Sequence, residues 1–383
     1  MSKEIRPGNP PLSLQIHARL QQRILQGEWA YGAVLPSEYE LCAEYGVSRG
    51  TVRVALDELE KEGLIRRERG RGTFVTRLPH TEPESQLNGR TISFIVPYVR
   101  DSFVPTILLG LESVARTNGY VVLFNHAENS LQKQEEALRL SLQQGVAGIV
   151  LYPVDSTDAP PVMLDIVQRN LPLVTVDRYV RGLAADYVIC NNFGGGLIAT
   201  RHLLQLGHRR IAFLSWQEPA VTIEHRRAGY RQALIEAGLA LDQGLEWEVK
   251  GYPDIDILAL TDLLQQSPRP TALFAANDQL ALAVQRTARI LRLSIPTDLA
   301  LVGFDNLDIS SHLDVPLTTI AQPAFDIGKV AGIQIINKIS GLSHEVEQTI
   351  LPVKLVVRQS CGAKLDAPIR DEGLPIVHLY PTP

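Results

Sequence analysis

The chain has 383 residues, of which 45% are hydrophobic and 21% are charged. This composition excludes wholesale disorder, and the length exceeds that of one small module, so we expect more than one hydrophobic core. The formal net charge of −5 is uneven, because residues 1–80 carry 12 Lys and Arg against 10 Asp and Glu while the remainder is acidic. No apolar run reaches about 18 residues and no cleavable leader is recognisable at the start, which predicts a cytoplasmic protein without a membrane segment.

The three cysteines, Cys42, Cys190 and Cys361, lie far apart in the sequence and show no CxxC spacing. Neither a disulfide framework nor a zinc site is therefore expected, and we interpret the three residues as small buried hydrophobes. The nine histidines are scattered, and no nucleophile-elbow, Walker-type or dinucleotide-binding motif occurs. The sequence thus predicts no enzyme, no cofactor and no metal site.

Residues 1–77 show the pattern of three helices followed by a β-hairpin. Apolar residues recur every four positions over 12–24, which predicts the first helix. Ser37 and Glu40 have the spacing of a capping box for a short second helix, and Ser48 can cap a third. This arrangement predicts a small helical domain at the front of the chain.

The third helix and the hairpin concentrate arginines. Arg49 and Arg53 stand one turn apart on the side opposite the apolar residues, with Thr51 nearby, and arginine on the first turns of a helix can read guanine in the DNA major groove. Residues 64–76 predict a hairpin with glycines at its tip and four arginines, a basic wing suited to phosphate or minor-groove contact. A solvated charged face is the alternative for any single arginine, but the order of helices, turn and wing favours DNA binding.

The segments Leu35-Pro36-Ser37-Glu38, Val47-Ser48-Arg49-Gly50-Thr51-Val52-Arg53 and Gly70-Arg71-Gly72-Thr73-Phe74-Val75 resemble the GntR family of regulators over residues 12–76. The resemblance implies a winged helix-turn-helix domain that binds a double-stranded DNA operator. In that family the positions matching Ser37, Tyr39, Arg49, Thr51, Arg53 and Gly70 approach DNA, although some members carry arginine where Tyr39 stands. We add Glu38, Ser48, Arg67, Arg69 and Arg71 as candidate DNA-contacting residues.

A second domain is predicted over residues 90–361. Residues 78–89 are rich in proline and polar residues and read as a linker, and residues 362–383 predict a loose tail. Between them, short apolar runs alternate with longer amphipathic segments, which is typical of α/β folds with parallel sheets, and the length suggests two doubly wound lobes. The predicted strands are 92–96, 121–124, 148–152, 173–176, 188–190, 211–214, 272–275 and 299–303.

Several of these strands end in polar residues. The carboxyl ends of parallel strands form ligand sites in such folds, so Asp177, Asn277 and Asp305 are the favoured ligand-binding candidates. Helix N-capping is at least as good an interpretation for Asn192, Ser215 and Asp278. Arg226 could bind ligand or form a surface ion pair. A cleft of carboxylates, amides and arginines suits a neutral polyhydroxyl compound, because each hydroxyl both donates and accepts hydrogen bonds.

Residues 90–360 resemble the LacI/GalR family, which is similar to periplasmic sugar-binding proteins. The resemblance is carried by segments such as Val176-Asp177-Arg178, Arg226-Arg227-Ala228-Gly229-Tyr230, Ala276-Asn277-Asp278 and Val302-Gly303-Phe304-Asp305-Asn306. It implies two lobes, one of about 90–190 and 322–348 and the other of about 191–320 and 349–361, with crossings near 189–191, 320–322 and 350. It also implies that the positions matching Asp177, Arg226, Asn277, Asp305 and Gln322 face a sugar or a purine.

A GntR-type head on a LacI-type core is similar to the arabinose-responsive repressors. Their first cleft segment resembles residues 98–105, which adds Tyr98, Asp101 and Phe103 to the effector-binding candidates. We therefore expect a homodimeric repressor of sugar-utilisation genes that a small sugar, an arabinose-like pentose by preference, releases from DNA. A purine or nucleoside effector is the alternative, and a cytosolic sugar-binding protein or an enzyme of the same fold is a further one. The sequence shows no clear aromatic sandwich for a flat ring beyond Tyr98 and Phe103.

Overall fold

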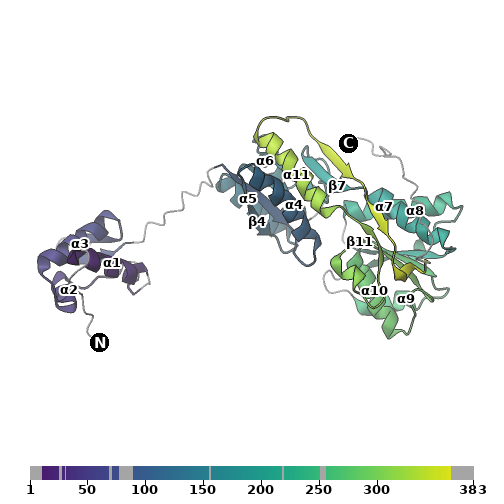
Figure 1. Cartoon of the computed structure of the whole chain (residues 1–383), viewed down its shortest axis with the longest axis horizontal. Helices are drawn as coiled ribbons and strands as arrows, with labels where there is room; N and C mark the ends of the chain where they lie inside the picture. Colours follow the sequence, from purple (N-terminus) through teal and green to yellow (C-terminus); the bar gives the residue numbers. More distant parts are fainter. Residues whose placement is uncertain are drawn as a thin grey trace. The chain divides into compact units, whose positions relative to one another are not determined.

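A computed structural model of the chain describes residues 11–25, 28–30, 32–68, 71–76, 89–154, 157–217, 220–250 and 256–363. The predicted linker lies almost entirely outside these residues, as does nearly all of the predicted tail. Clustering of contacts divides the chain into two compact units, Met1–Gln86 and Leu87–Pro383, which are described separately (Figure 1).

The first unit is a winged helix-turn-helix. It contains α1 (Leu12–Leu25), α2 (Glu38–Tyr45), α3 (Arg49–Lys61) and a hairpin of β1 (Ile65–Glu68) and β2 (Gly72–Val75). The predicted capping box is confirmed, since Ser37 accepts from the Glu40 backbone and the Glu40 carboxylate accepts from the Ser37 backbone. The fully buried core of this unit comes from all three helices and the hairpin.

The second unit holds two six-stranded sheets, each mostly parallel, which confirms the predicted fold class. The first lobe has the strand order β13-β7-β6-β5-β3-β4 and the second lobe β14-β12-β11-β10-β8-β9. The first-lobe strands are β3 (Thr91–Val96), β4 (Val121–His126), β5 (Gly148–Leu151), β6 (Leu173–Val176), β7 (Asp186–Cys190) and β13 (Gln348–Leu351). The second-lobe strands are β8 (Ile211–Trp216), β9 (Glu246–Val249), β10 (Ala272–Ala275), β11 (Ala300–Asp305), β12 (Thr318–Ala321) and β14 (Lys354–Val356).

Helices cover both faces of each sheet. In the first lobe, α4 (Phe103–Thr117) packs against α11 (Ala324–Ile339), and α5 (Leu131–Gln143) packs against α6 (Pro161–Gln168). In the second lobe, α7 (Asn192–Gln205) lies beside α8 (Val221–Glu236), while α9 (Ile257–Leu264) lies beside α10 (Asp278–Ile290) (Figure 1). No helix in the described part of the chain is long and apolar enough to cross a membrane.

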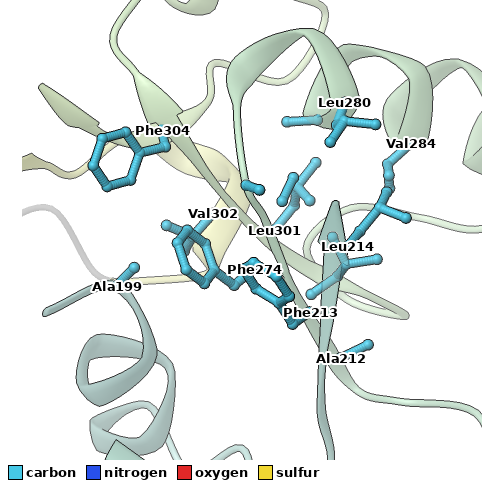
Figure 2. Close-up of a cluster of buried hydrophobic side chains, with 14 of the residues drawn as sticks. Ala199, Ala212, Phe213, Leu214, Phe274, Leu280, Val284, Leu301, Val302 and Phe304 are labelled. Carbon is cyan, nitrogen blue, oxygen red and sulfur yellow. The ribbon is translucent and has the colours of Figure 1, made fainter. Parts of the chain in front are cut away.

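The core of the second lobe lies between its sheet and these helices. Figure 2 shows Phe213, Phe274 and Val302, which come from three adjacent strands, together with Leu280 and Val284 of α10; all five are fully buried. Such all-apolar strands are expected where a parallel sheet is covered on both faces. Cys190 and Cys361 are buried as predicted, whereas Cys42 is only half-buried, and all three are free thiols.

The chain passes between the lobes at three places. It leaves the first sheet after Cys190, returns after Ala321 and leaves again after Leu351. The third crossing thus lies near residue 350 as expected, but the expected lobe boundary at 348/349 is three residues early, and residues 349–351 belong to the first lobe. The reason is that β13 stays paired in parallel with β7 as far as Leu351 opposite Cys190.

Two helix pairs approach so closely that only glycine fits. A Cβ on Gly196 of α7 would lie 2.2 Å from the Arg226 carbonyl oxygen of α8, and one on Gly229 would lie 2.1 Å from that of Phe193. A Cβ on Gly328 of α11 would lie 1.9 Å from the Ile107 carbonyl oxygen of α4. The glycine at position 196 thus allows the close packing of α7 on α8. This contact brings the start of α8 to the ligand cleft.

Candidate DNA-contacting surface and ligand cleft

One carboxylate holds both arginines of α3. Glu38 accepts a hydrogen bond from Arg49 Nε at 2.7 Å and from Arg53 Nε and Nη2 at 3.3 Å. These bonds lower the pKa of Glu38, with the bond from Arg49 as the largest cause. Both guanidiniums remain more than half exposed. Glu38 therefore sets the orientation of two arginines that stay accessible to a partner.

The other candidates on α2 and α3 surround this pair. Ser37, Tyr39 and Ser48 are exposed, and Tyr39 is 83% exposed. Thr51 is half-buried, with its hydroxyl 2.8 Å from the Ser48 hydroxyl. The structure therefore brings the predicted residues of the two helices to one region.

The two described wing arginines that are candidates for DNA contact, Arg67 and Arg71, have different surroundings. Arg67 turns back toward α3, where its Nη1 donates to Asp57 Oδ1 at 2.6 Å. Arg71 is exposed and pairs with Glu68 at 2.8 Å. Arg69 and Gly70 lie outside the described residues. Arg67 thus links the hairpin to α3 through this hydrogen bond.

The second unit contains a cavity of about 390 Å³ between its two lobes. This volume falls within the usual range of small-molecule sites. Its walls include all eight effector-binding candidates: Tyr98, Asp101, Phe103, Asp177, Arg226, Asn277, Asp305 and Gln322. The structure therefore gathers in one cleft residues that span more than 220 positions of the sequence.

Arg226 forms the polar centre of the second-lobe wall. It is 4% exposed, which rules out the alternative of a surface ion pair. Its Nε donates to Asn192 Oδ1 at 2.8 Å, its Nη1 donates to the Ala276 carbonyl at 2.6 Å, and its guanidinium lies 3.6 Å from the Phe304 ring centre. These contacts fix the guanidinium in the wall of the cleft, because the two acceptors and the aromatic ring together allow it only one orientation.

Asp305 stands beside Arg226 in a strained conformation. Its φ of 115° is one that residues with a side chain rarely adopt. Its Oδ1 accepts from Gln322 Nε2 at 2.7 Å and lies 3.5 Å from Arg226 Nη1. Burial raises the pKa of Asp305 well above its usual value, although Arg226 opposes the rise. The end of β11 thus presents to the cavity a largely buried carboxyl, with its side chain 15% exposed, at the cost of backbone strain.

Two further acidic residues line the first-lobe wall. Asp177 has a φ of 63° and lies 3.7 Å from the Arg178 guanidinium. Asp101 accepts from the Phe103 backbone at 3.0 Å, and burial raises the pKa of Asp101. The lining therefore sets three carboxyl groups against two guanidiniums, and each guanidinium already has a carboxyl neighbour. An anion that enters the cleft therefore meets a carboxyl group beside each guanidinium.

The cleft is more aromatic than the sequence indicated. Tyr98, Phe103, Tyr152 and Trp216 all line it, with the Tyr98 and Phe103 rings 6.1 and 6.4 Å from the Tyr152 ring. Tyr152 and Trp216 thus join Tyr98 and Phe103, the two aromatic candidates that the sequence indicated. The sequence did not indicate Tyr152 and Trp216, because they come from two different sheets and converge only in the fold.

The N-capping interpretation is wrong for the three residues to which it was applied. Asn191, not Asn192, caps α7, and Asn277, not Asp278, caps α10. Ser215 instead accepts a hydrogen bond from Arg227 Nη2 at 2.9 Å. In both caps the cap residue lies one position earlier than predicted, which leaves the following polar side chain free for tertiary contacts.

Because the Asp278 side chain does not cap α10, it can bind the loop after β11. It is 2% exposed and accepts from the Leu307 backbone, the Ser310 hydroxyl and the Thr319 hydroxyl at 2.9, 2.6 and 2.6 Å. Burial raises the pKa of Asp278 to about 6 against these bonds. Asp278 thereby connects the loop that follows Asp305 to β12.

The prediction missed several residues of the cleft. Arg178 directly follows Asp177 and Trp216 directly follows Ser215, so the rule of polar residues at strand ends could have found both. No comparable signal marks Ile223, Asn129 or Leu131, which reach the cavity from two helices and one loop. Within the described residues, no group of three or more His, Cys, Asp or Glu side chains could hold a metal ion.

A winged helix-turn-helix with two accessible arginines, joined to a two-lobed unit with a ligand cleft, defines a ligand-responsive DNA-binding regulator of transcription. The family model for bacterial regulatory proteins of the gntR family matches residues 12–75, and the model for a periplasmic binding protein-like domain matches residues 200–361.

Comparison with curated proteins gives the family. The chain is 30% identical over 357 residues to the arabinose metabolism transcriptional repressor of Geobacillus stearothermophilus, covering 91% of this chain and 97% of that protein. It is 32% identical over 273 residues to the HTH-type transcriptional repressor PurR of Vibrio campbellii, covering 71% and 81% of the two chains. The chain belongs to the family of bacterial transcriptional regulators that join a GntR-type DNA-binding domain to a LacI-type ligand-binding domain.

Solved structures agree with this assignment. A putative ribose operon repressor from Burkholderia thailandensis superposes with a TM-score of 0.63 at 26% identity, covering 70% of this chain and 99% of that one. The LacI family regulator of Enterococcus faecium with bound ribose gives a TM-score of 0.63 at 27% identity, covering 70% and 98%. The protein is therefore a sequence-specific DNA-binding regulator.

Proposed function

We propose that the protein represses sugar-utilisation genes and that a neutral sugar, an arabinose-like pentose by preference, releases it from its operator. The observation that carries the proposal is the convergence of the eight effector-binding candidates on one cleft. Relatives named as arabinose repressors match over nearly the whole chain, which favours a pentose over other sugars. In this proposal the residues named above on α2, α3 and the wing contact operator DNA.

The charge pattern of the cleft supports a neutral ligand over a sugar phosphate. Both guanidiniums have carboxyl neighbours, so a phosphate would meet carboxyl groups without an uncompensated cation. A neutral hydroxyl can instead donate to a carboxylate and accept from a guanidinium or an amide. Asp101, Asp177 and Gln322 are the residues that we propose to bind the hydroxyls, with Phe103 beneath the apolar face of the sugar.

A purine or nucleoside is the second candidate. The four aromatic residues of the cleft support it, since they offer faces on which a flat ring could stack. Several relatives are named PurR, and two of them cover 71% and 72% of this chain. We rank the purine second because the relatives that match both units are named for arabinose.

We propose that two copies assemble through the second unit and that the dimer acts in the cytoplasm, where its operator lies. The edge strand β4 and helix α4 carry exposed apolar side chains: Leu109 is 58% exposed and Val121 is 68% exposed. Such a surface is typical of a protein interface, and pairing of two copies would cover the open edge of the sheet. A dimer would present two heads to a pseudo-palindromic operator.

We propose binding and release as the whole activity, without catalysis. Among the described residues that line the cleft there is no histidine, cysteine or lysine, so three of the commonest general bases and nucleophiles are missing there. Ligand would close the two lobes about their three crossings. A typical coupling would weaken operator binding by about 5–150-fold.

The test is a thermal-shift panel of arabinose, other pentoses, hexoses, a pentose phosphate, a nucleoside and a purine, followed by operator titration with each hit. A ligand at about 100 times its Kd should stabilise the folded protein by roughly 2.7 kcal/mol. A pentose that both stabilises the protein and weakens operator binding would support the proposal. A purine hit would replace the effector, and a panel without any hit would refute the sugar cleft.

A further inference from the structure

The outer surface of α3 is divided into two rows. In its first two turns the exposed residues are Arg49, Gly50, Arg53 and Val54. Arg49 and Arg53 form a charged row that Glu38 holds together. Gly50 and Val54 are also one helical turn apart, like Arg49 and Arg53, and we call them the apolar row. A helix that enters a DNA groove thus presents two cations beside two groups without any hydrogen-bonding side chain.

The fold gives no reason for either member of the apolar row. Val54 is 49% exposed, whereas Val52 and Leu56 on the inner side are buried. A Cβ on Gly50 would meet only the Ser48 hydroxyl, at an ordinary contact distance of 3.9 Å. Gly50 has no positive φ that would call for glycine. Both glycine and a β-branched residue lower helix propensity relative to alanine, so the helix would form better with other residues at both positions.

The two rows match the chemistry of the DNA major groove. Guanine presents two acceptors that suit arginine, and thymine presents a 5-methyl group that suits a small apolar side chain. The charged row would place the helix against the polyanion, while a glycine at position 50 would allow its backbone to come close to a base edge. Exposed apolar atoms then become buried only when the partner is bound.

We propose that the apolar row reads thymine, with the Val54 side chain contacting a thymine 5-methyl group and Gly50 making room for this approach. The inference rests on the proposed function, because it requires a specific operator. It goes beyond that function in two statements about the operator. Each half-site contains a thymine next to the bases contacted by Arg49 and Arg53, and the 5-methyl group of this thymine contributes to the affinity.

The first experiment uses the full-length protein and an operator obtained by selection from random duplexes. Each thymine is replaced in turn by deoxyuridine, which removes only the methyl group. For the wild type, at least one replacement should weaken binding by about fourfold, the value of one buried methylene-sized group. For Val54→Ala the same replacement should have little effect. Val346→Ala, an exposed valine of the second unit, is the matched control and should keep the wild-type dependence.

Gly50→Ala separates this role from a structural one. Because the new Cβ meets open space, thermal stability should stay the same or rise, while operator affinity should fall by about tenfold or more if the backbone approaches DNA closely. The proposal is overturned if every deoxyuridine replacement is neutral, if Val54→Ala keeps the same methyl dependence, or if Gly50→Ala binds like the wild type. Selection of no duplex sequence at all would instead refute the proposed function, and this inference with it.

Discussion

Arg226 is the residue whose removal has the most specific expected result. Replacement by alanine deletes two charge-assisted hydrogen bonds and the stacking on Phe304, and it leaves the Asp305 carboxyl buried without its cation. Breaking a buried pair in this way costs about 3–5 kcal/mol. At about 2–4 °C per kcal/mol, the melting transition of the second unit should fall by about 6–20 °C.

A control on the same helix makes the measurement interpretable. Arg231 also lies on α8 and pairs with Glu246 at 2.7 Å, but its side chain is 46% exposed. Arg231→Ala should therefore cost only about 0.2–1 kcal/mol. In Arg226→Ala the pKa of Asp305 should rise further, because Arg226 opposes its rise, so the loss of stability should shrink as the pH falls.

The assay is differential scanning fluorimetry of the full chain with and without the pentose hit, paired with operator titration. Arg226→Ala should lose the shift caused by ligand and keep operator binding in the absence of ligand, since the DNA-binding unit is separate. The double variant with Asp305→Ala should be more stable than Arg226→Ala alone, because no carboxyl is then left without its cation in the cleft. Equal stability of Arg226→Ala and Arg231→Ala, or an unchanged response to ligand, would refute this reasoning.

Three further predictions concern other parts of the molecule. Arg49→Ala should reduce discrimination between operator and random DNA by about 1–3 kcal/mol in competition titrations and leave the thermal shift by ligand unchanged; equal loss of both would contradict the separation of the two units. Gly196→Ala should destabilise the second unit by about 1–3 kcal/mol in thermal melts, because a Cβ there would lie 2.2 Å from the Arg226 carbonyl oxygen and force α7 and α8 apart. Gly207→Ala is the control: a Cβ there would meet nothing within 4 Å, and the φ of 98° measures the effect of a positive φ without such a clash. Burial raises the pKa of Asp278 to about 6, so the folded protein binds this proton more tightly than the unfolded chain does. The stabilisation that comes from binding the proton is therefore complete at low pH and is lost as the pH rises through 6. The wild type should therefore gain about 1 kcal/mol relative to Asp278→Asn between pH 7 and pH 5, and a stability difference that is constant over this range would exclude the charge of Asp278 as the cause.

Elements with a strong periodic pattern were predicted well. The four-residue apolar spacing over 12–24 corresponds to α1, and all eight predicted runs correspond to strands of the two sheets. Four strands were not predicted: β9, β12, β13 and β14. β9, β13 and β14 are short and partly exposed, and β12 carries two threonines before its only large apolar residue. A run of four residues without strong alternation does not distinguish a strand from a loop, and pairing with a distant strand decides the matter.

Helix ends show where prediction from the sequence succeeds and where it fails. Ser37 and Glu40 satisfy each other within one turn, so the sequence alone identifies this cap. Asn191 and Asn192 are chemically equal candidates for the start of α7, as Asn277 and Asp278 nearly are for α10. The choice falls on the first residue of each pair because the second finds a partner far away: Asn192 in Arg226, and Asp278 in Ser310 and Thr319.

The sequence by itself determined the helices and strands that have a strong periodic pattern, the presence of a basic winged head, and, through its family resemblance, eight residues of one cleft. Those features depend on local spacing or on short motifs, which a linear chain carries directly. Only the tertiary structure decided that Glu38 joins Arg49 to Arg53, that Tyr152 and Trp216 share the cleft, and that Asp278 holds the loop of Asp305. Each of these depends on contact between residues far apart in the sequence, and such contacts exist only after the loops have closed and the sheets have formed.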